Sequence, residues 1–337
     1  MPHHDIVAIG GSAGALEAIT RMLQMLPGDI PASILVALHI GAANGNRTPR
    51  ILARHGPLPA EFARDGERLE RGRVYVAPPD RHLLIIGDRL RLGAGPWENG
   101  SRPAIDPLFR SCALSCGPRV VGVLLSGTLS DGSSGLRAIE RCGGIPVVQD
   151  PEDAAFGDMP RNALRFAGGA RIVAADRLAG LLVDVVAQQA GPPRPAPPDL
   201  RVEVEIAADG RTAVQTGEHG GRPSLFTCPE CHGAMREVDE GGPIRFRCHT
   251  GHAYTADSLQ AALGDDLRRA LGSALRVLDE RVMLLRRLEA EAIESGHGWN
   301  AARWQERASR LVRRRCRVLI NDRPPPDERD PAAEDGP

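Results

Sequence analysis

Short apolar runs alternate with helix-like stretches through the first 190 residues of this 337-residue chain, and this alternation restricts the fold more than any other feature. The runs expected to form strands cover residues 6–9, 33–38, 74–76, 120–125, 145–148 and 171–173. Apolar runs of this length that alternate with amphipathic stretches are typical of a parallel sheet covered by helices on both faces. The pattern predicts an α/β fold with a doubly wound, mainly parallel, Rossmann-like sheet.

Proline and turn residues divide the rest of the chain. Residues 191–199 are rich in proline and are expected to form a stiff, extended linker. We expect a hairpin over residues 83–92, with its turn at Gly87-Asp88, and a second over 201–215 around Asp209-Gly210. The expected parts are a domain over residues 1–190, the linker over 191–199, a hairpin plus a cysteine- and histidine-rich module over 200–256, an amphipathic helical region over 257–322, and a disordered tail over 323–337.

Composition excludes several classes of protein. The 42 basic and 43 acidic residues nearly cancel, which leaves a net charge of −1 and no excess for a nucleic-acid surface. No apolar run approaches the roughly 20 residues that span a bilayer, and the N-terminus has no signal-peptide core. The seven cysteines are too few and too scattered for a disulfide scaffold. We therefore expect a cytoplasmic protein of several domains that is not inserted in a membrane.

Three of the predicted strands end in residues that can carry chemistry. The first runs into Gly10-Gly11-Ser12-Ala13-Gly14, the second ends at His39, and a later one precedes Asp131. The carboxyl ends of parallel strands lie at one edge of a sheet, so these three side chains are expected close together. An imidazole suits the task of taking the serine proton, and a carboxylate on its other nitrogen fixes the tautomer.

The residues alone also allow a non-catalytic interpretation of Ser12, His39 and Asp131. The glycine-rich turn could hold a phosphate, although the acidic residue expected at the end of the second strand is replaced by His39. His39 could also be a core histidine, and Asp131 could cap the helix expected to begin near Gly132. Ser12 could be a small residue that fills a tight turn.

Several longer segments of the first half are similar to segments of a known protein family. Residues 5–186 resemble the catalytic domain of the chemotaxis-type protein-glutamate methylesterases, the CheB type. The Gly-x-Ser-x-Gly segment of that family is matched by residues 10–14, and its histidine after the second strand by His39. Other similar blocks are residues 65–83, residues 102–109, the Asp131-Gly132 loop and residues 159–161.

The resemblance implies hydrolysis of γ-glutamyl methyl esters on methyl-accepting chemoreceptors, with deamidation of receptor glutamines as a second reaction. Ser12 would be the nucleophile, His39 the general base and acid, and Asp131 the orienting carboxylate. The backbone N–H groups of Ala13 and Thr128 would bind the oxyanion, and catalysis would need no cofactor. The alternative is a non-catalytic signalling adaptor that keeps the esterase-like fold and binds partners through its C-terminal half.

The sequence departs from the family pattern at three places. Ala13 stands where members commonly have a hydroxyl residue, and Leu129 replaces a glycine next to the second oxyanion donor. These changes bear on rate and substrate choice. The well-known members also begin with a receiver domain, whereas the first strand here starts near residue 5, so we expect no control by phosphorylation in cis.

The second half contains a spacing typical of structural zinc sites. Cys228-Pro229-Glu230-Cys231 is followed by Cys248-His249-Thr250-Gly251-His252. Cys228, Cys231, Cys248 and His252 are the expected ligands, with His249 and His232 as alternative nitrogens. Four protein ligands would leave no open position, so the metal is expected to be a structural Zn²⁺ that supplies folding energy.

The helical region at the C-terminal end carries an apolar stripe and an arginine stripe. Leucines at helical spacing from Leu259 to Leu288 predict a long amphipathic helix, which a second helix near residues 301–320 would partner. Arg303, Arg307, Arg310, Arg314 and Arg317 share one face of that second helix. We interpret these arginines as a solvated or partner-docking face rather than a nucleic-acid surface, because aromatic residues are only 3% of the chain.

Overall fold

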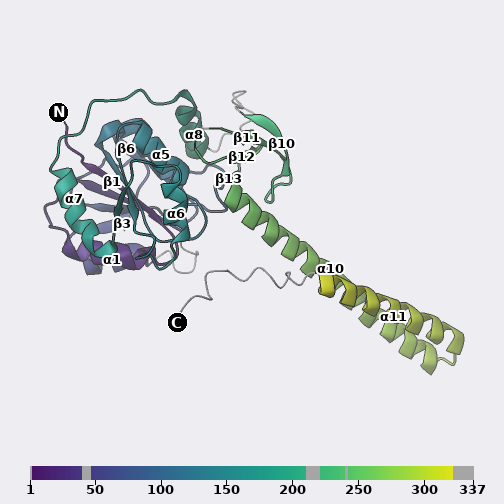
Figure 1. Cartoon of the computed structure of the whole chain (residues 1–337). Helices are drawn as coiled ribbons and strands as arrows, with labels where there is room; N and C mark the ends of the chain where they lie inside the picture. The colour runs from purple at the N-terminus through teal and green to yellow at the C-terminus, as the bar shows by residue number, and fades with distance from the viewer. Residues whose placement is uncertain (1, 40–46, 210–220, 240–241, 322–337) are drawn as a thin grey trace, which may run out of the picture. The chain divides into compact units, whose positions relative to one another are not determined.

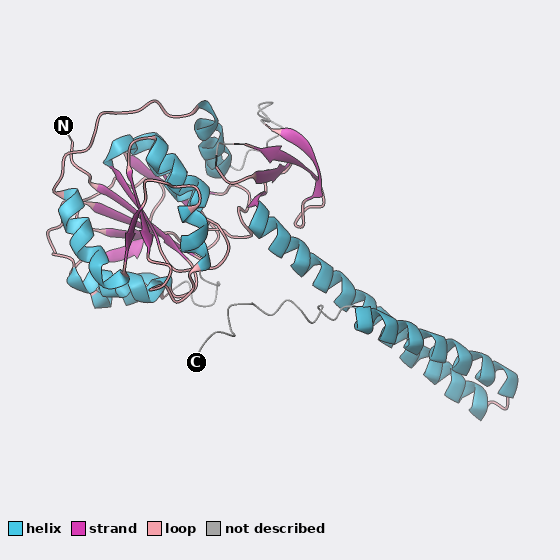
Figure 2. Cartoon of the chain, in the orientation of Figure 1, coloured by secondary structure: helices cyan, strands magenta, loops and turns pink. Residues whose placement is uncertain are grey.

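The computed structural model describes residues 2–39, 47–209, 221–239 and 242–321 (Figure 1). The chain divides into two compact units, Met1–Ala262 and Leu263–Pro337. The first unit contains an α/β domain and a small antiparallel sheet, and the second is helical (Figure 2). In the described residues no helix is both long enough and apolar enough to cross a membrane.

The α/β domain is built on a seven-stranded parallel sheet with the order β3-β4-β2-β1-β7-β8-β9. Its strands are β1 (Ile6–Gly11), β2 (Ser33–Leu38), β3 (Ala60–Phe62), β4 (Val74–Val76), β7 (Val120–Leu124), β8 (Ile145–Gln149) and β9 (Arg171–Val173). The predicted doubly wound parallel sheet is confirmed. Only the short edge strand β3 was not expected.

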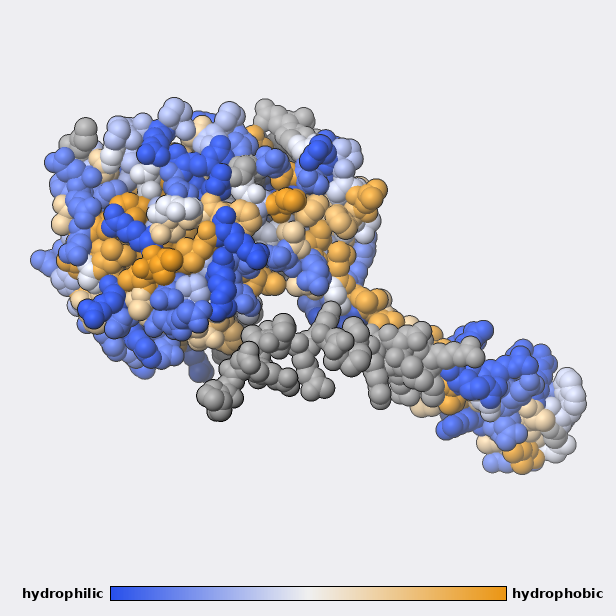
Figure 3. Space-filling model, viewed as in Figure 1, coloured by the Kyte–Doolittle hydropathy of each residue, from blue (hydrophilic) through white to orange (hydrophobic). Residues whose placement is uncertain are grey.

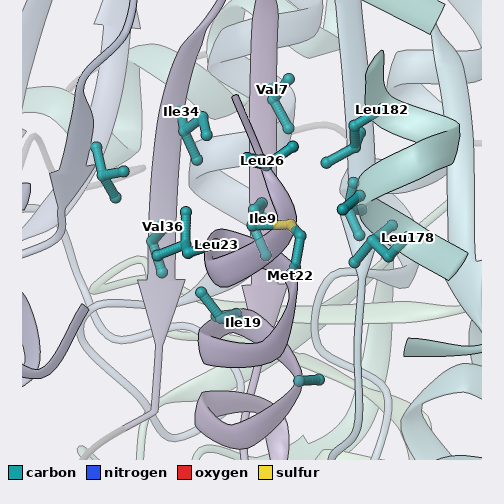
Figure 4. Packing of buried hydrophobic residues seen from close by; sticks show 14 of the residues in the cluster. Val7, Ile9, Ile19, Met22, Leu23, Leu26, Ile34, Val36, Leu178 and Leu182 are labelled. Carbon is teal, nitrogen blue, oxygen red and sulfur yellow. The ribbon is translucent and has the colours of Figure 1, made fainter. Parts of the chain in front are cut away.

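Helices cover both faces of this sheet. The helices on one face are α1 (Ala15–Met25), α3 (Thr48–His55), η2 (Ala175–Arg177) and α7 (Leu178–Val186), and those on the other are α4 (Ile105–Cys116), η1 (Gly117–Arg119), α5 (Ser133–Arg141) and α6 (Asp158–Leu164). Val7 and Ile9 of β1 point toward Met22 of α1 and Leu178 of α7, as Figure 4 shows. Because both faces are covered, the central strands are buried throughout, as expected for parallel sheets.

The predicted hairpin over residues 83–92 is confirmed as β5 (His82–Ile86) and β6 (Arg89–Gly93), which pair in antiparallel fashion. The second predicted hairpin, over residues 201–215, is wrong where the chain is described. Residues 198–209 form helix α8 (Pro198–Asp209), and residues 210–215 lie outside the described part. Leu200, Val204, Ala207 and Ala208 share the buried face of α8, and this tertiary burial outweighs the alternating pattern.

The cysteine- and histidine-rich segment forms a four-stranded antiparallel sheet, which we call the Cys/His module. Its strands are β10 (Arg222–Thr227), β11 (Ala234–Val238), β12 (Arg245–Cys248) and β13 (Ala253–Thr255), in that order across the sheet. The module follows α8 in the chain and belongs to the first compact unit.

Two helices account for the described part of the second unit. Helix α10 (Ala256–Glu294) starts in the first unit and continues into the second, where α11 (Gly298–Asn321) runs back along it (Figure 1). Val282 of α10 and Ala301, Ala308 and Leu311 of α11 are buried, so the predicted helical hairpin is confirmed. Hydrophilic residues cover most of its visible surface in Figure 3.

Candidate active site and metal centre

Strand register places Ser12 and His39 side by side. Strands β1 and β2 run parallel with Gly11 opposite Leu38, so the residues that follow them leave the same edge of the sheet together. Asp131 lies in the loop after β7, the neighbour of β1 on its other side. From β1 the chain adds β2 on one side of the sheet, and it later adds β7 on the other side. Open α/β sheets bind ligands at such a switch point, here between β1 and β7.

The turn that carries Ser12 is fixed by its backbone. The Ser12 N–H donates to the Ser126 carbonyl (2.9 Å), and the Ser12 carbonyl accepts the Ala15 N–H (3.1 Å) as α1 begins. Gly14 has φ +79°, and a Cβ there would lie 2.7 Å from the Ser126 Oγ, so this corner requires glycine. The turn holds Ser12 half-buried at the start of α1.

Asp131 is a buried carboxylate surrounded by donors. His39 Nε2 lies 2.7 Å from Oδ2, and the Ile105 N–H donates to the same oxygen at 2.7 Å. Oδ1 accepts the Asn99 amide (2.8 Å) and the Gly132 N–H (2.9 Å). The interpretation of Asp131 as a cap of the helix near Gly132 therefore describes only one of its contacts. Its Oδ2 also caps the N-terminus of α4.

These contacts determine the charge at the site. Burial by itself raises the pKa of Asp131, but the hydrogen bond and charge of His39 and the N–H of Ile105 outweigh it and hold that pKa well below its ordinary value. A carboxylate only accepts hydrogen bonds, so the Nε2 of His39 donates and its Nδ1 is left as the basic nitrogen. Within the described residues no hydrogen bond joins the Ser12 hydroxyl to His39. Hydrogen bonds between a nucleophile and its base are often long or poorly aligned until substrate binds.

A second buried carboxyl group lies beside the first. Asp106, in the first turn of α4, accepts the Gly135 N–H at 2.7 Å and the Asn99 amide at 3.2 Å. Burial and then the negative charge of Asp131 raise the pKa of Asp106 to about 7. The two carboxyl groups therefore have opposite preferences: Asp131 stays ionised and Asp106 holds its proton into the neutral range.

The proposed oxyanion donors lie in exposed loops at the same edge of the sheet. Ala13 follows Ser12, and Thr128 follows Gly127, where a Cβ would lie 3.0 Å from the Cβ of Ser12. The next residue, Leu129, has φ +62°. A branched side chain rarely adopts this left-handed conformation, whereas glycine adopts it without strain. Leu129 therefore replaces the family's glycine at a position where the backbone favours glycine.

Sequence reasoning missed a residue that contacts the candidate triad. Asn99 lies in the loop between β6 and α4, which buried His82 anchors by accepting the Ala104 N–H (3.2 Å) and bonding to the Pro96 carbonyl (2.9 Å). Asn99-Gly100 in the sequence indicates only a turn, and both residues indeed have positive φ. No pattern in the chain links this turn to Asp131.

Comparison with known proteins identifies the family of the α/β domain. Residues 7–182, just over half of the chain, match the family described as CheB methylesterase. The chain belongs to the CheB methylesterase family. The matched residues include Ser12, His39 and Asp131, and they end before the Cys/His module begins.

Individual relatives resemble this CheB methylesterase-family chain over the same region. It is 44% identical over 187 residues to a protein-glutamate methylesterase/protein-glutamine glutaminase of Anaeromyxobacter dehalogenans, covering 53% of this chain and 54% of that protein. It is 35% identical to a putative enzyme of the same name from Leptospira interrogans, covering 54% and 94%. The chain thus spans about half the length of the first relative. The crystal structure of the Thermotoga maritima CheB methylesterase catalytic domain superposes with a TM-score of 0.52 and 27% identity, covering 54% of this chain and 98% of that one.

Outside the family match, the structure gathers the four expected metal ligands. The ligand atoms of Cys228, Cys231, Cys248 and His252 all lie within 4.8 Å of one another. The Sγ atoms of Cys231 and Cys248 are 3.5 Å apart, and the Nδ1 of His252 is 3.6 Å from the Sγ of Cys228. A tetrahedral Zn²⁺ with bonds of about 2.3 Å places its sulfur ligands roughly 3.8 Å apart, so this cluster could bind a metal ion.

The two alternative nitrogens lie outside this cluster. His232 and His249 are both exposed, and the ring of His249 packs on Gly233, where a Cβ would collide with it. The remaining described cysteines, Cys112, Cys116 and Cys142, are free and buried in the α/β domain. The structure therefore selects Cys228, Cys231, Cys248 and His252 as one set.

Proposed function

We propose that this chain is a protein-glutamate methylesterase of a chemosensory system. Its substrate would be the γ-glutamyl methyl ester of a methyl-accepting chemoreceptor or a receptor-like signalling protein in the cytoplasm. The observation that carries the proposal is the buried, ionised Asp131 bonded to His39 at 2.7 Å, one strand away from the exposed turn of Ser12. The printed names of the relatives in Anaeromyxobacter and Leptospira support this substrate class.

The proposed mechanism uses protein groups alone. The Ser12 hydroxyl attacks the ester carbonyl while the Nδ1 of His39 takes its proton, and Asp131 stabilises the imidazolium that forms. The backbone N–H groups of Ala13 and Thr128 would bind the oxyanion, a contribution of roughly 3–4 kcal/mol per donor in measured enzymes. His39 then protonates the departing methoxide, methanol leaves, and water hydrolyses the acyl-enzyme by the reverse proton path. A glutamine side chain would release ammonia by the same steps.

We further propose that the Cys/His module binds a structural Zn²⁺ through Cys228, Cys231, Cys248 and His252. Three thiolates and one imidazole are a ligand set that Zn²⁺ prefers, and all four positions are filled by protein. The module has a small apolar core of few residues, so metal binding would supply much of its folding free energy. We assign no catalytic step to the metal.

Methanol release from a methylated receptor tests the proposed reaction. The intact, Zn²⁺-loaded chain should release methanol, and Ser12→Ala should abolish the release while leaving the fold unchanged by circular dichroism. Ser115→Ala, which alters a serine in α4 on the covered face of the sheet, is a matched control and should keep full turnover. If the intact chain releases no methanol from several methylated receptors, the reaction is wrong.

The alternative of a non-catalytic adaptor rests on the strained Leu129 and on Ala13. In that case, signalling partners would bind the Cys/His module or the helical hairpin. Retention of receptor binding together with undetectable hydrolysis would favour the adaptor over the esterase. Loss of hydrolysis in the Ser12→Ala variant alone favours the enzyme.

A further inference from the structure

The carboxamide of Asn99 joins the candidate triad to the Cys/His module. Its nitrogen donates to Asp131 Oδ1 at 2.8 Å. Its oxygen accepts the backbone N–H of Thr255 at 2.9 Å and the hydroxyl of Ser258 at 2.7 Å. Thr255 ends β13 and Ser258 lies in the first turn of α10, so the oxygen is held entirely by residues beyond the family match.

Two further contacts hold the same neighbourhood from the module side. The Asn99 N–H donates to the Ala253 carbonyl at 2.7 Å, which extends β13 onto the loop that carries Asn99. The hydroxyls of Thr255 and Ser130 lie 2.6 Å apart, and Ser130 directly precedes Asp131. Thr255 and Ser258 are buried, so water does not substitute for these hydrogen bonds.

A buried cluster of five charged residues fixes the module to the α/β domain. Glu203 of α8 accepts hydrogen bonds from Arg110 of α4 (2.9 Å) and Arg245 of β12 (2.8 Å), and it also bonds Arg247. Glu98, next to Asn99 in the chain, bonds Arg110 and Arg245, the latter at 3.0 Å. Burial raises the pKa of both glutamates, but the three arginines outweigh it and keep both ionised. Such a cluster tolerates little movement because any displacement leaves a buried charge unpaired.

The candidate metal ligands bracket the strands that make these contacts. Cys248 ends β12, which carries Arg245 and Arg247, and His252 stands three residues before Thr255. Two of the four candidate ligands therefore flank the turn between β12 and β13. A metal bound there would hold β13 in register with β12, and through β13 it would hold Asn99.

We propose that the Cys/His module is a working part of the esterase site, in which Thr255 and Ser258 position Asn99 and Asn99 positions Asp131. The inference rests on the proposed function, because Asp131 orients His39 only in an esterase. Metal loading of the module thereby sets the geometry of the triad. Thr255, Ser258 and Asn99 act through Asp131 and are therefore positioning residues.

Substitutions in the module test this link in the full chain. Ser258→Ala removes the hydroxyl that donates to Asn99, and Thr255→Val removes the hydroxyl that bonds Ser130 and Ser258. Each should lower kcat about 3–10-fold with KM unchanged, as expected for the loss of buried hydrogen bonds that act only on catalysis. Thr255→Ser keeps the hydroxyl and should restore kcat. Ser224→Ala removes a comparable hydroxyl from β10, which bonds the Met235 carbonyl, and should keep the kcat of the intact protein. Equal kcat values in all four variants and the intact chain would overturn the inference.

Amide hydrogen exchange provides a readout that needs no activity. The N–H groups of Ile105 and Gly132 donate to the Asp131 carboxylate, so they should exchange faster in Ser258→Ala and after removal of metal with a chelator. Zn²⁺ added back should restore their protection, whereas the β1 amides should stay protected throughout. Unchanged exchange at Ile105 and Gly132 in the metal-free protein contradicts the inference. A chain that releases no methanol but shows this exchange response contradicts the proposed function alone.

Discussion

Arg110 of α4 and Glu203 of α8 form an ion pair of 2.9 Å between side chains that are only 1% and 8% exposed. The pair ties the α/β domain to a helix that follows the proline-rich linker. Two arginines of the Cys/His module share the same carboxylate. Three parts of the chain thus meet at Glu203.

Replacing Glu203 with glutamine should strongly destabilise the first compact unit. Glutamine keeps the shape of the side chain but removes the negative charge that Arg110, Arg245 and Arg247 share. Breaking such a buried ionic cluster costs roughly 3–5 kcal/mol. Urea unfolding of the full chain measures this loss. Glu205→Gln, on the exposed side of the same helix, is the matched control and should change the unfolding free energy by less than about 0.5 kcal/mol.

The ionisation of Asp106 should appear in the pH dependence of stability. Its pKa is about 7 in the folded protein, against an ordinary 3.8, so the folded state binds the proton more tightly. Stability is then lost as pH rises from about 4 to about 7, and it stays low above that range. The loss is at most about 4 kcal/mol.

Asp106→Asn isolates this effect, because every other titrating group is common to both proteins. We would measure the unfolding free energies of both proteins at pH 5, 6, 7 and 8. The unfolding free energy of the variant, relative to that of the intact protein, should increase as pH rises. Parallel curves for the two proteins would show that Asp106 titrates normally.

Asp131→Asn should abolish most of the activity without unfolding the protein. An amide can donate to His39, which favours the tautomer that has no free basic nitrogen toward Ser12. In a serine protease the corresponding change lowers kcat by about 10⁴. Methanol release at saturating substrate measures the loss, and the exposed Asp176→Asn serves as control. Turnover within tenfold of the intact chain would contradict the role assigned to Asp131.

Metal content provides a direct check of the Cys/His module. We expect one Zn²⁺ per chain by mass spectrometry of the purified protein. Cys248→Ser should weaken binding by more than about 100-fold, since even residues that only support metal ligands contribute 10–100-fold. Cys142→Ser alters a buried thiol of the α/β domain and should leave the metal content unchanged. Equal Zn²⁺ in both variants would exclude this site.

The sequence predicted the parts that depend on local patterns. Apolar runs identified the central strands, and the rule that parallel strands share one carboxyl edge brought Ser12, His39 and Asp131 together. The cysteine spacing likewise predicted four candidate metal ligands, and their ligand atoms lie within 4.8 Å of one another. Helix α8 escaped prediction because packing against α4 and β6, not its own pattern, decides its structure. Asn99 escaped because its partners Asp131 and Thr255 are 32 and 156 positions away in the chain.

Leu129→Gly should stabilise the protein, unlike most leucine-to-glycine changes. Leu129 adopts φ +62°, a conformation that costs a side-chain-bearing residue about 1–2 kcal/mol. The residue is 36% exposed, so its loss of apolar burial is smaller than that of a core leucine. Glycine returns part of this gain through its greater freedom in the unfolded chain, about 0.5–1 kcal/mol. Thermal unfolding should therefore show a gain of up to about 1 kcal/mol. Leu225→Gly, at a fully exposed position of β10, should lower stability by a similar amount, because glycine weakens a strand. The same sign for both substitutions would show that Leu129 is not strained.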